Sequence, residues 1–72
     1  MTPEKMVMMA NQIAAFFATQ KGNDQAQRVA DHISDFWEPR MRLQLARHAE
    51  AGGAGLVPLA REAAGLMRIP AG

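Results

Sequence analysis

The stretch 36–42 most constrains how this chain can fold, because it joins the only tryptophan to a proline. Proline disfavours helical geometry in the residue before it, so a helix that arrives at Trp37 should end there and leave Glu38 extended. Pro39 can then open a new helix, since its ring presets the backbone angle and no N–H donor is needed at a first helical position. The stretch therefore predicts a sharp corner between two helices, with the indole of Trp37 at its apex.

Length and composition indicate one small domain that spans residues 1–72. A domain of this size buries only about 60 to 65% of the surface of its unfolded chain, so we expect its own stability to be marginal. Hydrophobic residues make up 49% of the chain, which is too many for a disordered protein. The chain has no cysteine, so disulfides and thiolate metal sites are excluded.

Charge and hydropathy restrict the partners that we expect. The formal net charge of +1 gives no reason to expect nucleic acid or an acidic membrane surface. No apolar run approaches the ~20 residues that span a bilayer, and the N-terminus lacks the layout of a signal peptide. We therefore expect a cytoplasmic protein.

Apolar periodicity predicts an all-α domain of three to four short helices. The expected helices cover Pro3–Gln20, Gln25–Trp37 and Pro39–Ala51, followed by a short one that begins at Pro58. Thr2 should cap the first helix, and Asn23 or Asp24 the second. The first two helices, joined by a short turn, should pack as an antiparallel hairpin.

The hairpin has two apolar stripes that we expect to form the core. The stripe of the first helix comprises Met6, Met9, Ala10, Ile13, Phe16 and Phe17. The stripe of the second comprises Ala26, Val29, Ala30, Ile33, Phe36 and Trp37, on the side opposite Arg28, Asp31, His32 and Asp35.

The second half of the chain has a different character. The helix from Pro39 is apolar on two sides, which is typical of a helix with two neighbours, and one of these could be another chain. The glycine-rich segment 51–55 predicts a flexible connection, and residues 69–72 predict a loose tail.

No motif predicts catalysis or a metal site. His32 and His48 are the only imidazoles, and neither has carboxylates at a recognised ligand spacing, so we interpret both as solvated side chains. Asp31 and Asp35 lie one turn apart on an exposed face, as ordinary surface carboxylates do. An independent enzyme that uses either histidine is the least favoured interpretation.

Arg40, Arg42 and Arg47 form the one local basic cluster, beside Trp37. Tryptophan, methionine and arginine are enriched in the cores of protein–protein interfaces, so the cluster favours docking to a partner protein. The main alternative is a small DNA-binding module that uses the helix from Pro39 as its recognition helix. Against that alternative stands the near-neutral net charge.

With these residues in view, the chain resembles the delta subunit of the cytoplasmic, NAD-dependent, molybdenum-containing formate dehydrogenases. The resemblance covers nearly the whole chain, and its most specific part is the corner that contains Trp37 and Pro39. It rests on Met9-Ala10-Asn11-Gln12-Ile13, Phe16-Phe17, Val29-Ala30, His32-Ile33, Phe36-Trp37, Pro39-Arg40-Met41-Arg42, Gly52-Gly53, Gly55-Leu56 and Pro58-Leu59.

The resemblance implies an accessory, non-catalytic subunit that holds no cofactor of its own. In such enzymes the large (alpha) subunit carries a molybdenum bis-pterin-guanine-dinucleotide cofactor and iron–sulfur clusters, and other subunits carry FMN and the NAD site. The small subunit is expected to bind the large one and to support its assembly or stability. The residues to which the resemblance assigns partner-binding roles are Asn11, Gln12, Trp37, Pro39, Arg40, Met41 and Arg42.

Overall fold

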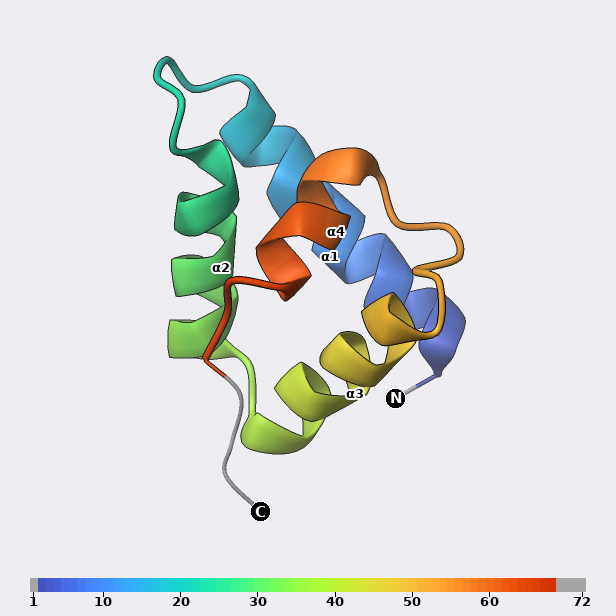
Figure 1. Ribbon diagram of the computed structural model, residues 1–72. Coiled ribbons are helices and arrows are strands. Elements are labelled where there is room, and N and C mark those ends of the chain that lie inside the picture. Colours follow the sequence, from blue (N-terminus) through green and yellow to red (C-terminus); the bar gives the residue numbers. More distant parts are fainter. Residues whose placement is uncertain (1, 69–72) are drawn as a thin grey trace.

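The computed structural model describes residues 2–68, and these form four α-helices and no strand. Figure 1 shows the helices α1 (Pro3–Ala18), α2 (Gln25–Phe36), α3 (Pro39–Glu50) and α4 (Pro58–Ala64). The predicted all-α fold is confirmed. The tail predicted at 69–72 lies outside the described residues.

Local sequence determines where the helices begin. Proline stands in the first turn of α1, α3 and α4, where its missing N–H group breaks no helical hydrogen bond. Thr2 caps α1 as predicted, because its hydroxyl accepts a hydrogen bond from the Lys5 amide at 3.2 Å. Trp37 and Glu38 are extended, with ψ of 143° and 152°, and this forms the predicted corner between α2 and α3.

The prediction for the start of α2 is only half right. Asp24 occupies the N-cap position, but its side chain makes no capping hydrogen bond. Its carboxylate instead pairs with Arg28 one turn later, at 3.1 Å. The carboxylate of Asp24 therefore contacts the Arg28 guanidinium and not the backbone amides of the first turn.

The helices are arranged around α4. In Figure 1, α1 and α2 diverge from the turn between them, α4 lies in the resulting V, and α3 runs across its open end. The most extensive contact between helices joins α2 to α4. Helix α3 contacts both α1 and α4, so the two neighbours expected from its two apolar sides lie within this chain.

The core combines a few large side chains with many alanines. Met6, Val29, Ile33 and Leu45 are its largest fully buried members. Trp37 is 7% exposed and joins the same cluster. Helix α4 contributes Ala60, Ala63 and Ala64, whose small side chains let its backbone approach α1 and α2 closely.

Two residues predicted for the core are on the surface. Phe16 is 62% exposed and Phe36 is 74% exposed. Each lies at the edge of the apolar stripe of its helix. Because α4 fills the V between α1 and α2 with its alanines, it covers the centres of both stripes and leaves these edges open.

Hydrogen bonds join the glycine-rich segment between α3 and α4 to the end of α3 and to α1. The Gly53 amide donates to the His48 carbonyl at 2.9 Å, and His48 Nε2 lies 2.8 Å from the Ala54 carbonyl oxygen. On the α1 side, the Asn11 amide group holds the backbone at Gly55 and Val57.

Candidate functional site

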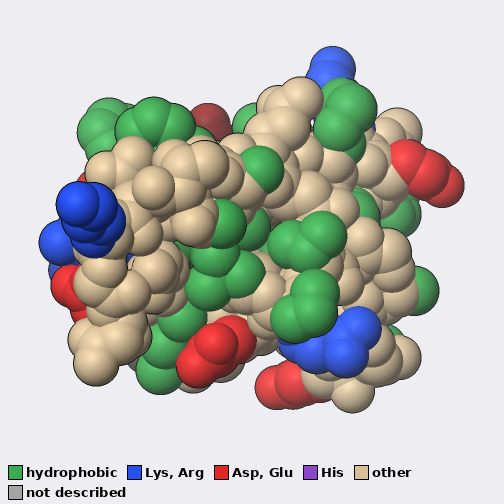
Figure 2. Space-filling view, turned by 90° about the horizontal axis from the view of Figure 1, so that it is seen from above, with side chains coloured by type: hydrophobic (Ala, Val, Ile, Leu, Met, Phe, Trp, Pro, Cys, Tyr) green, Lys and Arg blue, Asp and Glu red, His purple; other side chains and the backbone are tan. Residues whose placement is uncertain are grey.

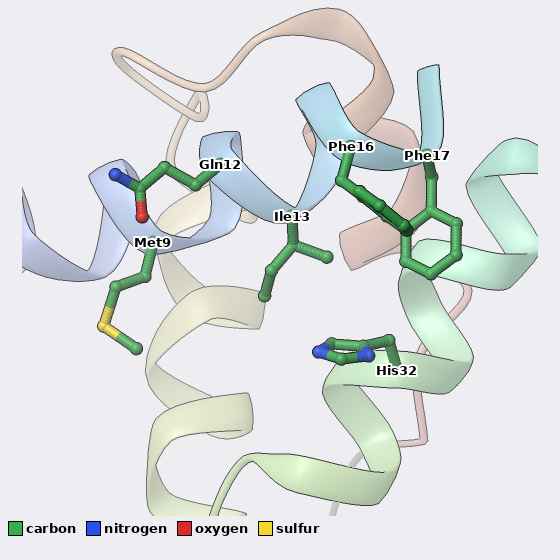
Figure 3. Close-up of a pocket in the computed structure, with 6 residues that line it drawn as sticks. All are labelled: Met9, Gln12, Ile13, Phe16, Phe17 and His32. Carbon is green, nitrogen blue, oxygen red and sulfur yellow. The ribbon is translucent and has the colours of Figure 1, made fainter. Parts of the chain in front are cut away.

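A groove between α1 and α2 is the strongest candidate for a functional site. Met9, Gln12, Ile13, Phe16, Phe17 and His32 line a hollow of about 380 Å³, which we call the α1–α2 groove. Figure 3 shows that α1 supplies five of these side chains and α2 supplies His32, whose ring faces them from below. All lie on the side of the hairpin that α4 does not cover.

Aromatic rings form one wall of the groove. The rings of Phe16 and Phe17 meet edge to face, with centroids 5.2 Å apart and an interplanar angle of 83°. The His32 ring lies between Phe17, at 6.0 Å, and Phe36, at 4.7 Å. An edge-to-face pair such as Phe16–Phe17 contributes about 0.5 to 1.5 kcal/mol beyond its buried area, and the contacts of the His32 ring join Phe36 to this pair.

The groove and Phe36 together form an exposed apolar surface. Phe16 and Phe36 expose most of their area, whereas Met9, Ile13 and Phe17 are half-buried against the core. Scattered single apolar residues are normal on protein surfaces, but a contiguous apolar patch marks a site of interaction. The arrangement is suited to binding another apolar surface.

The predicted contact residues in the first half of the chain differ in their exposure and in their contacts within the chain. Gln12 is exposed and lines the groove. The side chain of Asn11, one position earlier, bonds to the backbone of the segment before α4. Trp37 is almost wholly buried, so it supports the corner from inside.

The predicted contact residues on α3 also divide into two groups. Pro39 and Arg40 are exposed at the corner, and Met41 is half-buried against the core. The half-buried Arg42 donates from Nη1 to the Arg68 carbonyl at 2.8 Å. Arg42 therefore fastens the segment that follows α4, and it is not a free cation for DNA phosphates.

The two histidines of the described chain lie against other groups of the protein, and no metal site forms around them. Among residues 2–68, no group of three or more His, Asp or Glu side chains could hold a metal ion. His48 is engaged with the Ala54 carbonyl and His32 with two phenyl rings. No helix of the described part of the chain has the length and hydropathy needed to cross a bilayer.

A second hollow lies on another side of α1. Asn11, three alanines of α1 and the start of α4 line it: Ala14, Ala15, Ala18, Val57, Pro58 and Leu59. Figure 2 looks down on the face where α4 begins and shows hydrophobic side chains across its middle, with charged ones around the rim. This hollow has no aromatic ring, whereas two phenylalanine rings and the His32 ring line the α1–α2 groove.

Sequence reasoning missed Phe16 and Phe36 as surface residues, and it did not place the solvated His32 beside the aromatic rings. One signal for them was present. Phe36 lies one turn after His32, and Phe16 lies one turn after Gln12, so each phenylalanine borders the polar side of its helix. Periodicity alone does not say whether another helix covers such an edge.

Comparison with models of protein families matches residues 5–64 of this chain to the NADH-dependent formate dehydrogenase delta subunit FdsD. The match extends from the first turn of α1 to the end of α4. No curated protein matches the chain.

Proposed function

Since the chain belongs to the delta-subunit family of NADH-dependent formate dehydrogenases, we propose that it is an accessory, non-catalytic subunit that binds the large, molybdenum-containing subunit of a cytoplasmic enzyme. Its role in this proposal is to support the assembly or the stability of that subunit. Membership of the family makes it a component of a formate dehydrogenase.

The observation that carries the proposal is the exposure of Phe16 and Phe36 beside the α1–α2 groove. Removing apolar surface from water contributes roughly 25 cal/mol per Å², from which the entropic costs of association are subtracted. Aromatic side chains and methionine are also enriched in interface cores, and the groove combines both. A large partner that covers this surface would complete a core that four short helices leave open.

The contact roles expected from the sequence can be divided by accessibility. We assign direct contact to Gln12, Pro39 and Arg40, which are exposed. Asn11, Trp37 and Arg42 act indirectly in this proposal, because they hold the loop, the corner and the end of α4 in place. Met41 is half-buried and contributes its exposed edge.

In this proposal the redox chemistry belongs to other subunits. The molybdenum bis-pterin-guanine-dinucleotide cofactor and the iron–sulfur clusters reside in the large subunit, and FMN and NAD bind elsewhere in the complex. The absence of cysteine from this chain supports the division, because cluster ligation uses cysteine thiolates.

A co-purification experiment tests the proposal. The tagged large subunit is co-expressed with this chain, either unchanged or as the double variant Phe16→Ala with Phe36→Ala. We expect the double variant to reduce recovery at least about tenfold, because aromatic anchors at an interface often contribute 2 kcal/mol or more each. Native mass spectrometry gives the recovered stoichiometry.

The matched control is the double variant Met8→Ala with Leu66→Ala, which removes side chains that are 52% and 46% exposed outside the groove. It should be recovered like the unchanged chain. Circular dichroism should show that both double variants stay helical. Equal recovery of the two double variants would contradict the proposed surface.

A further inference from the structure

The α1–α2 groove carries polar groups that an apolar occupant alone would leave unsatisfied. Gln12 and His32 both line it, and neither side chain has a hydrogen-bond partner in the described part of the chain. In Figure 3 the two side chains lie on opposite sides of Ile13, one on α1 and the other on α2. Covering a polar group without a partner costs about 1 to 3 kcal/mol, so a stable occupant must bring polar atoms to both places.

One cation, Lys5, lies in line with the groove on α1. Lys5 lies one turn before Met9 on the same side of α1, is exposed, and pairs with no carboxylate among residues 2–68. Asp24, the N-cap residue of α2, and Asp35, within α2, each form an ion pair with an arginine. An occupant with acidic side chains along its flank would complement Lys5.

The two remaining acids within α1 and α2 are Glu4 and Asp31. Glu4 lines a different hollow, together with Val7 and His48. Asp31 accepts a hydrogen bond from the Gln27 amide at 2.9 Å, on a face of α2 away from the groove. Neither forms an ion pair with Lys5.

The wall of the groove favours a helical occupant. Met9, Gln12, Ile13 and Phe16 follow one another at the spacing i, i+3, i+4 and i+7, which makes a ridge along α1. Such ridges pack into the grooves of a second helix. The described part of the chain has no strand, so it offers no sheet edge to which an extended peptide could add.

We infer that the α1–α2 groove receives an amphipathic helix of the large subunit, whose apolar side packs against Ile13 and Phe17 and whose flank places carboxylates toward Lys5, Gln12 and His32. This inference rests on the proposed function and deepens it, because it specifies the element and the charge that the partner must present. It assigns Gln12 to the polar edge of the contact.

Charge substitutions at Gln12 test the sign of the partner's flank. The large subunit is passed over immobilised unchanged chain, Gln12→Lys and Gln12→Glu, and association rates are measured at low and high salt. Rim charges act mainly on association rates, so at low salt we expect Gln12→Lys to associate about threefold faster and Gln12→Glu about threefold slower. Salt screening should remove most of the difference.

Gln27 provides the matched control, since it is exposed on another face of α2. Gln27→Lys and Gln27→Glu should change the rate much less than the same substitutions at Gln12. Equal effects at the two positions, or a reversed order at Gln12, would overturn the inference.

Photo-cross-linking tests the helical form of the occupant. Benzoylphenylalanine replaces Phe16, and separately Phe36, and the cross-linked residues of the large subunit are identified by mass spectrometry. We expect attachment sites three or four residues apart within one amphipathic helix. Attachment sites scattered over loops or along an extended segment would overturn this inference and leave the proposed function standing. A chain that does not associate with the large subunit at all would overturn both.

Discussion

At the scale of single residues, Asn11 shows how one side chain can connect distant parts of a small protein. Its Nδ2 donates to the Gly55 carbonyl at 2.9 Å, and its Oδ1 accepts from the Val57 amide at 3.0 Å. Gly55 has a φ of +82°, and a Cβ there would lie 3.2 Å from Val7 Cγ1. Glycine therefore lets the loop approach α1 closely enough for the Asn11 amide to hold it.

Asn11→Ala should lower the free energy of unfolding by about 1 to 3 kcal/mol, because two hydrogen bonds of about 0.5 to 1.5 kcal/mol each are lost. Urea unfolding followed by Trp37 fluorescence measures the change. Gln12→Ala, one position along, removes an exposed side chain and should stay within about 0.5 kcal/mol of the unchanged chain. If both variants unfold at the same urea concentration, the Asn11 bonds do not stabilise the fold.

At the scale of elements, α4 depends on the other helices. Its seven residues are too few for a stable isolated helix, and its three buried side chains are all alanines. Polar contacts hold the chain at both of its ends. Before α4, Asn11 binds Val57. After α4, Arg68 donates its amide to Ser34 Oγ at 3.0 Å and pairs with Asp35 at 2.6 Å.

Ser34→Ala should loosen the end of α4 without unfolding the molecule. The Arg68 amide then loses its acceptor, and a loss of about 1 kcal/mol corresponds to roughly fivefold more frequent local opening. Hydrogen exchange measured by mass spectrometry should therefore speed up in residues 60–68 and stay unchanged in α1.

Arg68→Gln serves as the comparison, because it removes only the ion pair with Asp35. Both partners of that pair are well exposed, and exposed pairs contribute only about 0 to 1 kcal/mol. Its effect on exchange should be smaller than that of Ser34→Ala. Equal acceleration in α1 and α4 would show that the Ser34 bond acts on global stability instead.

At the scale of the whole molecule, the four helices fold around a core that contains few large apolar side chains. A protein of this length has an unfolding free energy of roughly 4 to 11 kcal/mol, at 0.05 to 0.15 kcal/mol per residue. Helix α4 packs against α1 and α2 with alanines, and it leaves the side chains of Phe16 and Phe36 uncovered. A partner that binds this surface only in the folded state raises the free energy of unfolding of the chain.

The large subunit should therefore protect this chain against global unfolding. A partner at one hundred times its dissociation constant adds about 2.7 kcal/mol, which corresponds to roughly 100-fold slower exchange of the amides that exchange only by global opening. Exchange in α2 peptides, with and without the large subunit, measures the effect. The double variant Phe16→Ala with Phe36→Ala should show no such protection; full protection of that variant would place the contact elsewhere on the chain.

The sequence alone determined the helices, the corner and the family. Pro3, Pro39 and Pro58 each act on their own local backbone, and apolar periodicity is a property of neighbouring positions. The tertiary structure decided which apolar edges stay open and which polar side chains, such as Asn11 and Arg42, bond to distant segments of the chain. Phe16 and Phe36 are exposed because α4, more than twenty residues away in sequence, occupies the other side of their helices. Periodicity states that a face is apolar, and only the packing of distant segments states what covers it.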